Sequence, residues 1–267
     1  MQSSSSILNP TAKFLLEARF SQTLHQNIPT ELYPDSQKQA IEIQSEIVAK
    51  LTQKYRSEVC GYKLACTNDL AMTLLNVTEP FPGRLMSHST HQSGIKFNPD
   101  DFCHRVVELE FGFRIDQNVP PSDIPYNANT IKPYIGEFLP GIEIVDHRYE
   151  DFTQVGALAL IADNAIHGQS VFGKACSDWR EVDLKHHPVS LFINDTLFST
   201  GTGINVLGDP LNVVAWLQNY LAQHSQSLQC GDQITTGTAC DVYSAQPGDI
   251  IKADFGQLGE VSCSFNS

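Results

Sequence analysis

The chain has 267 residues, of which 41% are hydrophobic and 18% charged, a composition typical of one large domain with or without a smaller appendage. Its formal net charge of −13 argues against a nucleic-acid partner, because little positive charge is left to neutralise phosphates. The sequence contains no run of about 18 apolar residues, so we expect no membrane span and no membrane partner.

The cysteines and the N-terminus bear on the compartment. The seven cysteines are scattered and odd in number, and no two of them form a Cys-x-x-Cys pair. The N-terminus lacks the basic region followed by an apolar stretch that a signal peptide would have. These features predict reduced thiols in a cytoplasmic protein.

The first elements in the chain read as helical. Between residues 10 and 55, the stretch DSQKQAIEIQSEIVAKLTQKY places its apolar residues on one broad stripe, with Asp35 as the predicted N-cap. Such a stripe is more typical of a helix that packs on a core than of a binding helix. We therefore expect a helical N-terminal segment over residues 1–58.

Residues 59–267 form the second predicted unit, which is rich in strands. Short apolar runs alternate there with Gly, Pro and Asp turns. The expected strand regions are 59–67, 106–115, 134–149, 157–173, 189–200, 233–240 and 249–265. One helix is expected among them at 208–225, with Asp209 as its N-cap and Pro210 at the first helical position.

The strand RVVELEFGFRI, residues 105–115, carries two acids on one face. Alternate side chains of a strand point to opposite sides, so Glu108 and Glu110 stand next to each other. The opposite face is apolar and belongs to a core; it consists of Val107, Leu109, Phe111 and Phe113. Two harmless acids on a solvent-exposed face are one explanation of this pattern.

A second strand repeats the arrangement, because Glu143 in LPGIEIVDHRY lies on the face opposite its isoleucine neighbours. Adjacent like charges repel, and Glu is a poor strand residue. Three strand carboxylates that need neutralising suggest a divalent cation, and oxygen ligands favour Mg²⁺, Mn²⁺ or Ca²⁺ over Zn²⁺. Three protein ligands on an octahedral ion leave positions for water and a chelating substrate.

Seven motifs occur in a characteristic order: GYKLACT, RVVELEFGF, LPGIEIVDHR, IADNAIHG, GTGINVLGDPLNVVAWLQNYL, CGDQITTGTAC and PGDIIKADFGQLGEVSCSF. This ordered set resembles the 2-keto-4-pentenoate hydratase family, which lies within the fumarylacetoacetate hydrolase superfamily and includes the 4-oxalocrotonate decarboxylases. The resemblance covers residues 60–267 well and the N-terminal helices loosely. It implies an α+β fold, in which the helical N-terminal segment precedes a mixed β-roll or distorted barrel, and it implies a homo-oligomer.

The resemblance also implies a metal and a substrate. Glu108, Glu110 and Glu143 match the family ligands of Mg²⁺ or Mn²⁺. The family substrates are 2-oxo or 2-hydroxy-dienoic acids from aromatic ring degradation, which chelate the metal through the 1-carboxylate and the 2-oxygen. The metal stabilises negative charge on the 2-oxygen as an enolate forms, and a hydratase then adds water to the conjugated end.

A hydratase is therefore the predicted activity, and three alternatives stay open. A decarboxylase would use the same electron sink to release CO₂. A C–C hydrolase ranks lower, because it would need a His–Glu pair that we do not identify from the sequence. The third is a homologue that binds metal and a keto acid, or a partner chain, without turnover.

Two residues are predicted to take part in catalysis. Lys63 matches the family's strand lysine near the site, where it would bind an anionic substrate or move a proton; an exposed strand lysine is the alternative. His88 lies in FPGRLMSHST, where many hydratases carry an acidic residue in a stretch like DFGxLFADM. A histidine could take over acid–base chemistry there, or the loop serves a different substrate. We identify no Ser-His-Asp context for Ser89 or Ser199.

The predicted substrate-binding residues lie in three loops. Gly201 in STGTG could offer a backbone N–H to a carboxylate, or form a turn. In the family, TTGT closes a strand in the pocket wall, so Thr236, Gly237 and Thr238 are expected there, where Thr236 or Thr238 could bond the substrate carboxylate. Asp163 in IADNAIHG is expected either in or beside the pocket or as a turn former.

Overall fold

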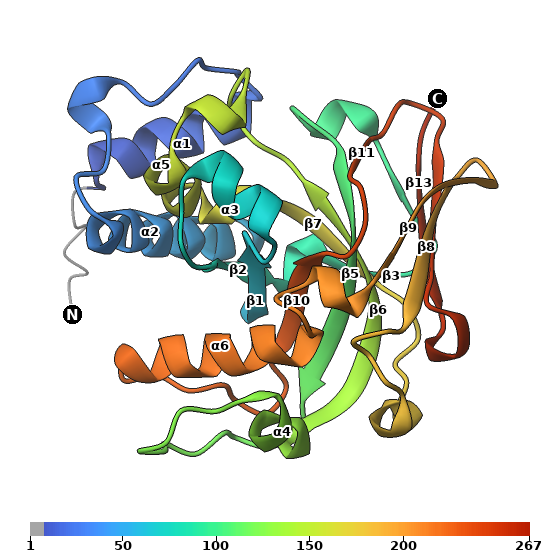
Figure 1. The fold of residues 1–267 in the computed structure, drawn as a ribbon. Helices are drawn as coiled ribbons and strands as arrows, with labels where there is room; N and C mark the ends of the chain where they lie inside the picture. The colour runs from blue at the N-terminus through green and yellow to red at the C-terminus, as the bar shows by residue number, and fades with distance from the viewer. Residues whose placement is uncertain (1–7) are drawn as a thin grey trace.

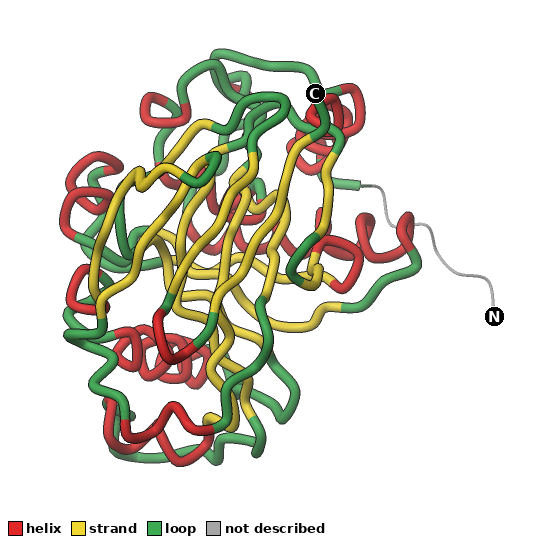
Figure 2. Tube along the Cα trace, turned by 90° about the vertical axis from the view of Figure 1, so that its right-hand side faces the viewer, coloured by secondary structure: helices red, strands yellow, loops and turns green. Residues whose placement is uncertain are grey.

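The computed structural model describes residues 8–267 and stacks them in layers (Figure 1). Helices lie on one side of a large curved sheet, and a smaller sheet lies on the other side; the view turned by 90° shows the strands of both sheets running through the molecule (Figure 2). The first seven residues, with which the N-terminal stretch expected to lack a signal peptide begins, lie outside the described residues.

The helices are α1 (Pro10–Ser21), α2 (Gln37–Tyr55), α3 (Asp69–Leu75), α4 (Ala128–Ile131), α5 (Ala157–Ala162) and α6 (Pro210–Gln223). The strands of the larger sheet are β1 (Val59–Ala65), β2 (Phe81–Met86), β3 (Thr90–Gln92), β5 (Val106–Ile115), β6 (Ile135–Val145), β7 (His167–Phe172), β10 (Gln233–Thr238) and β11 (Tyr243–Ser244). The smaller sheet contains β4 (Ile95–Phe97), β8 (Pro188–Ile193), β9 (Thr196–Thr202), β12 (Ile250–Asp254) and β13 (Glu260–Phe265).

The order of strands in the larger sheet is β2-β1-β10-β5-β6-β7-β3, with β11 pairing with β5. The smaller sheet has the order β4-β13-β12-β8-β9. The main apolar core fills the space between the sheets, because the apolar face of β5 points toward the smaller sheet; the ring of Phe111, for example, lies 5.5 Å from that of Phe255. The expected mixture of helix and sheet is confirmed.

A second apolar cluster holds α1 and α2 against later parts of the chain. Ile43 and Ile47 of α2 are buried in the same cluster as Leu160 of α5 and Phe81 of β2. The predicted N-cap of α2 is wrong by one position. Ser36 caps the helix by accepting a hydrogen bond from Gln39 N, because its backbone has the extended conformation that a cap requires.

A continuous strand was expected over residues 157–173, but the structure does not contain one there. Residues 157–162 form α5, and only His167–Phe172 form β7. A short apolar run such as ALALIA fits a buried helix as well as a buried strand, so its pattern alone does not decide between them. The helix α3, from Asp69 to Leu75, was also not expected.

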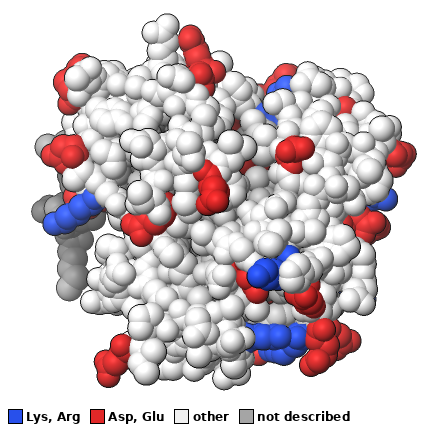
Figure 3. Space-filling model, viewed as in Figure 1, with Lys and Arg blue, Asp and Glu red and all other residues white. Residues whose placement is uncertain are grey.

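The helix α6 agrees with its prediction, since Asp209 is the N-cap and its side chain accepts a hydrogen bond from Leu211 N. No helix among residues 8–267 is long and apolar enough to cross a membrane. On the face drawn in Figure 3, lysine and arginine side chains are few and do not gather into a continuous patch.

Candidate metal centre

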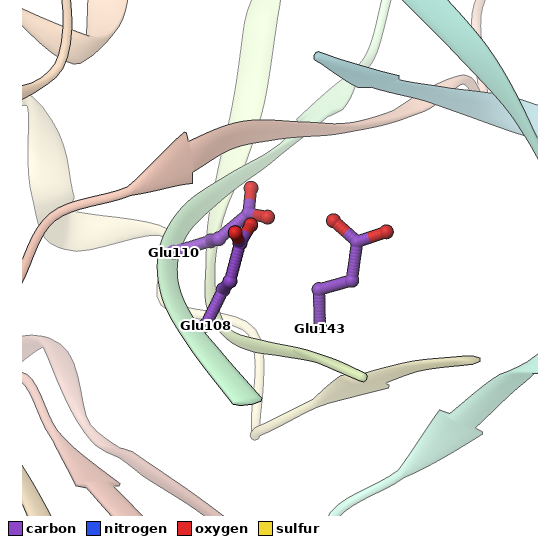
Figure 4. A group of neighbouring side chains, drawn as sticks. All are labelled: Glu108, Glu110 and Glu143. Carbon is purple, nitrogen blue, oxygen red and sulfur yellow. The ribbon is translucent and has the colours of Figure 1, made fainter. Parts of the chain in front are cut away.

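Three carboxylates meet on the face of the larger sheet that points away from the smaller sheet. Glu108 and Glu110 come from β5, and Glu143 comes from β6, where it is the direct cross-strand partner of Glu108. One carboxylate oxygen from each residue lies within 4.8 Å of the others (Figure 4). Glu110 and Glu143 are fully buried and Glu108 is partly exposed, so these are not acids on an ordinary solvated strand face.

Glu110 and Glu143 are held in place by N–H groups. The backbone N–H of Gly237 donates to Glu110 Oε2 at 2.5 Å. His167 Nδ1 lies 2.9 Å from Glu143 Oε1, and Lys63 Nζ lies 3.3 Å from Glu143 Oε2. Among the described residues, Glu110 Oε1 and Glu143 Oε2 have no hydrogen-bond partner. Glu110 and Glu143 therefore each present one buried oxygen that accepts no hydrogen bond from the described residues.

The electrostatics of the cluster follow from burial and crowding. Burial, only partly offset by Lys63, raises the pKa of Glu108 to about 7. Burial and the charges of the other two acids raise the pKa of Glu110 well above its usual value. Burial also opposes ionisation of Glu143, but Lys63 and His167 outweigh it and hold its pKa low. Three ionised carboxylates would thus exceed the positive charge that Lys63 supplies.

These properties fit a divalent cation. A buried carboxylate oxygen without a partner is costly, and a bound cation would supply that partner for Glu110 and Glu143. The donor set contains only carboxylate oxygens, which suits Mg²⁺ or Mn²⁺ rather than a softer metal.

Lys63 on β1 is buried, which excludes the exposed strand lysine that was the alternative. Its Nζ donates to the backbone oxygen of Ala165 at 3.2 Å and faces Glu143. Burial alone would lower the pKa of Lys63, but Glu143, Glu108 and Glu110 together raise it, so the side chain carries its charge at neutral pH.

His167 is a residue of this cluster that the sequence analysis missed. Its imidazole is buried between Glu143 and Ser89, whose Oγ lies 3.4 Å from His167 Nε2. No Ser-His-Asp context was expected for Ser89, and its histidine neighbour is indeed paired with a glutamate; the His–Glu pair itself was not identified from the sequence. The signal in the sequence was the His-Gly step in IADNAIHG, which the strand expected over residues 157–173 had absorbed.

Asp163, expected in or beside the pocket or as a turn former, contacts two arginine side chains in the structure. Its Oδ1 accepts from Arg19 at 3.0 Å, and its Oδ2 accepts two hydrogen bonds from Arg148 at 2.8 and 2.7 Å. All three side chains are largely or fully buried. Because both oxygens are engaged by guanidinium groups, the geometry assigns Asp163 to a buried ion-pair network.

Gly201 on β9 is also explained by packing. A Cβ added there would lie 1.9 Å from the backbone oxygen of Ala239, so only glycine allows β9 to approach this segment. The contact brings β9 next to the end of β10. It does not support the predicted role of Gly201 as a donor to substrate.

The TTGT stretch, residues 235–238, lies beside the acids, and its residues make different hydrogen bonds. Gly237 binds Glu110 directly, as described, and its φ of +87° suits glycine. Thr236 Oγ1 donates to the backbone oxygen of Phe111, and Thr238 Oγ1 donates to that of Cys240. Thr235, which was not predicted, has a buried hydroxyl with no hydrogen-bond partner among the described residues and pairs in register with Lys63.

His88 lies in the turn after β2 and contacts the C-terminal end of α2. Its ring stacks on Tyr55 with centroids 4.3 Å apart, and its Nδ1 lies 2.9 Å from Ser57 Oγ. Burial and the nearby His167 lower the pKa of His88 to about 4. None of its hydrogen-bond or stacking contacts is with an acid of the cluster, so this position does not support the predicted proton-transfer role.

A family model places the chain among known proteins. Residues 75–266, well over half of the chain, match the model for the fumarylacetoacetate (FAA) hydrolase C-terminal family. The chain belongs to this family. The expected resemblance to 2-keto-4-pentenoate hydratases and 4-oxalocrotonate decarboxylases is confirmed by the relatives described next.

Relatives of this FAA hydrolase family member fall into both enzyme groups. A 4-oxalocrotonate decarboxylase of Pseudomonas putida is 27% identical, over 78% of each chain. A 2-keto-4-pentenoate hydratase of Paraburkholderia xenovorans is 28% identical, over 78% of this chain and 77% of the relative. The structure of 4-oxalocrotonate decarboxylase from Pseudomonas putida G7, complexed with magnesium and adipate, superposes with a TM-score of 0.88 at 25% identity, covering 97% of each chain.

Proposed function

We propose that this protein is a divalent-metal-dependent hydratase that adds water to a 2-hydroxy-2,4-dienoate of the 2-keto-4-pentenoate type, in the degradation of aromatic compounds. The observation that carries the proposal is the buried cluster of Glu108, Glu110 and Glu143 beside Lys63. Relatives named for this activity, together with relatives that form CO₂ from a similar acid, support the assignment to the lyases.

Mg²⁺ or Mn²⁺ is the proposed cofactor, held by Glu108, Glu110 and Glu143. When bound, such an ion polarises a chelating 2-oxo acid and stabilises negative charge on its 2-oxygen. The cluster supplies three carboxylates, and the substrate would approach from the side of Glu108, which is the member that is partly exposed.

Lys63 is the residue that we assign to substrate binding and proton transfer. A lysine ammonium has three N–H bonds: one is donated to Ala165 O, and the charge is ion-paired with Glu143 Oε2 at 3.3 Å. An N–H bond of Lys63 that is not donated to Ala165 O is available to an anionic substrate or to a proton transfer along the dienol. The buried surroundings strengthen this interaction, because water does not screen it.

The end of β10 is the proposed second wall of the substrate site. The backbone N–H of Gly237 donates to Glu110, so the residues next to Gly237 in the chain lie close to the cluster. Thr236, Thr238 and the partnerless hydroxyl of Thr235 are the candidates for bonding the substrate carboxylate. A homo-oligomer remains part of the proposal, and light scattering during gel filtration tests it.

Decarboxylation of a 2-oxo-enedioate is the second candidate, and structural similarity favours it. The decarboxylase structure matches nearly the full length of this chain, and a second curated decarboxylase aligns over 88% of it. Both reactions use the same enolate, so the cluster by itself is compatible with either.

An ultraviolet assay distinguishes these outcomes. The protein is mixed with Mg²⁺ and freshly generated 2-hydroxypenta-2,4-dienoate, and the loss of dienol absorbance is followed with and without EDTA. We expect loss that requires metal, with a hydroxylated keto acid as product. Glu108→Gln should reduce the rate by more than the roughly 10–100-fold that changes around metal ligands cost. Glu137→Gln is the matched control, because Glu137 lies on the neighbouring strand β6 and is ion-paired with Arg114, away from the cluster.

Undiminished loss of dienol in EDTA would contradict the proposal. Release of CO₂ from a 2-oxo-enedioate, with no turnover of the dienoate, would favour the decarboxylase. Tight binding of Mg²⁺ and oxalate without any turnover would favour a homologue that binds but does not react.

A further inference from the structure

His167 lies between the metal cluster and the interior of the protein. Its Nδ1 lies 2.9 Å from Glu143 Oε1, while its Nε2 faces Ser89 Oγ at 3.4 Å. Ser89 also donates to the backbone oxygen of Met86 at 3.1 Å. All three side chains, Glu143, His167 and Ser89, are buried, so the imidazole has little freedom to turn.

An unusual backbone turn delivers His167 to this position. The three residues before it, Asn164, Ala165 and Ile166, all have left-handed conformations with φ of 55°, 50° and 51°. Such conformations are unfavourable for residues other than glycine, above all for a β-branched isoleucine, and they persist only where the surroundings enforce them. The same turn aims the backbone oxygen of Ala165 at Lys63 Nζ.

Contacts from distant parts of the chain enforce the turn. The side chain of Asn164 pairs with the backbone of Arg84 on β2, accepting from its N–H at 2.7 Å and donating to its oxygen at 3.0 Å. Arg19 of α1 donates to the backbone oxygen of His167 at 3.2 Å. Gln44 of α2 donates to the backbone oxygen of Ile161 at 2.8 Å. The two N-terminal helices α1 and α2 thus stabilise the turn and the helix before it through these hydrogen bonds.

The two oxygens of Glu143 consequently differ. Oε1 is engaged by His167, whereas Oε2 has no hydrogen bond from residues 8–267 and lies on the side of Lys63 and the other acids. We propose that His167 is a positioning residue, which fixes Glu143 so that Oε2 is the oxygen presented to the divalent ion. This inference rests on the proposed metal centre. On this proposal the left-handed turn places both His167, which contacts Glu143 Oε1, and Lys63, which is ion-paired with Glu143 Oε2.

Binding of Mn²⁺, measured by calorimetry and by electron paramagnetic resonance, tests this role without requiring turnover. His167→Asn keeps an N–H group near the position of Nδ1, whereas His167→Gln moves it toward the position of Nε2. We expect His167→Asn to retain Mn²⁺ affinity near that of the wild type, and His167→Gln to lose about 10- to 100-fold. His186→Leu is the matched control, because it removes an exposed histidine 2.7 Å from Asp183.

The outcomes separate the positioning role from the metal centre itself. Equal Mn²⁺ affinity in His167→Asn, His167→Gln and the wild type, with loss in Glu143→Gln, would overturn the role of His167 and keep the metal centre. Absence of Mn²⁺ binding in the wild type would overturn both. If a His167 variant fails to fold, as judged by circular dichroism, Ser89→Ala replaces it; unchanged Mn²⁺ affinity and an unchanged resonance spectrum in Ser89→Ala would then overturn the proposal.

Discussion

Lys63 and Glu143 form an ion pair across three strand spacings of one sheet. Their strands, β1 and β6, are separated by β10 and β5, yet Lys63 Nζ lies 3.3 Å from Glu143 Oε2. Strands in a flat sheet would place these backbones about 14 Å apart, so the curl of the sheet and the long lysine side chain together close the gap. The cluster is therefore a product of sheet curvature.

Removal of the lysine charge should separate metal binding from turnover. In Lys63→Met we expect kcat to fall by about 100-fold or more, because the proposed proton-transfer group is lost. Affinity for Mg²⁺ should stay equal or rise, since a cation that competes for Glu143 is gone. Steady-state kinetics and calorimetry measure the two effects. An unchanged kcat would remove Lys63 from the proposed mechanism.

The stability of the metal-free protein should depend on pH through Glu108 and Glu110. Burial raises both of their pKa values, to about 7 for Glu108, so the folded state binds protons more tightly than the unfolded state. The contribution of Glu108 to stability is complete below the unfolded pKa of about 4.5 and is lost as the pH rises through about 7. Glu110 acts in the same direction. The low pKa of Glu143 acts only at lower pH, where acid removes its contribution.

Thermal unfolding in EDTA, measured between pH 4.5 and 8, checks this dependence. We expect the melting temperature of the wild type to decline relative to that of Glu108→Gln as the pH rises, because the variant cannot ionise there. Added Mg²⁺ should raise the melting temperature more at pH 8 than at pH 5. Parallel curves for the two proteins would show that Glu108 titrates normally.

The reassignment of Asp163 predicts a loss of stability instead of a loss of substrate affinity. Asp163→Asn leaves Arg148 buried with incomplete compensation, and removing one partner of a buried ion pair typically costs about 3–5 kcal/mol. Urea unfolding should show this loss, while the folded fraction keeps the KM of the wild type. A raised KM at unchanged stability would restore the sequence-based assignment of Asp163 to the substrate pocket.

His88 should be dispensable for proton transfer. Its ring stacks on Tyr55 and contacts Ser57, and its pKa of about 4 leaves it neutral at physiological pH. We expect His88→Gln to change kcat by less than about threefold, equivalent to roughly 0.6 kcal/mol of activation free energy. The pH–rate profile should also keep its shape. A large loss of kcat would return His88 to the catalytic role that the sequence suggested.

Several features of this protein follow from local sequence rules. The two-residue period of the stretch at 105–115 is enough to put Glu108 and Glu110 on one face, because strand geometry leaves no other arrangement. The Asp-Pro pair at 209 and 210 is likewise enough to begin α6. Such inferences succeed because the interactions involved span only a few residues.

Other features depend on tertiary structure. The pairing of Glu143 with Glu108 requires the register of β5 on β6, and the ion pair of Lys63 requires the curl of the sheet. His167 reaches Glu143 only after a left-handed turn that no local propensity favours and that Arg84 and Arg19 stabilise from elsewhere in the chain. Local sequence thus determined which acids the site contains, whereas long-range packing decided which nitrogen groups surround them, because that packing overrides the intrinsic preferences of the backbone.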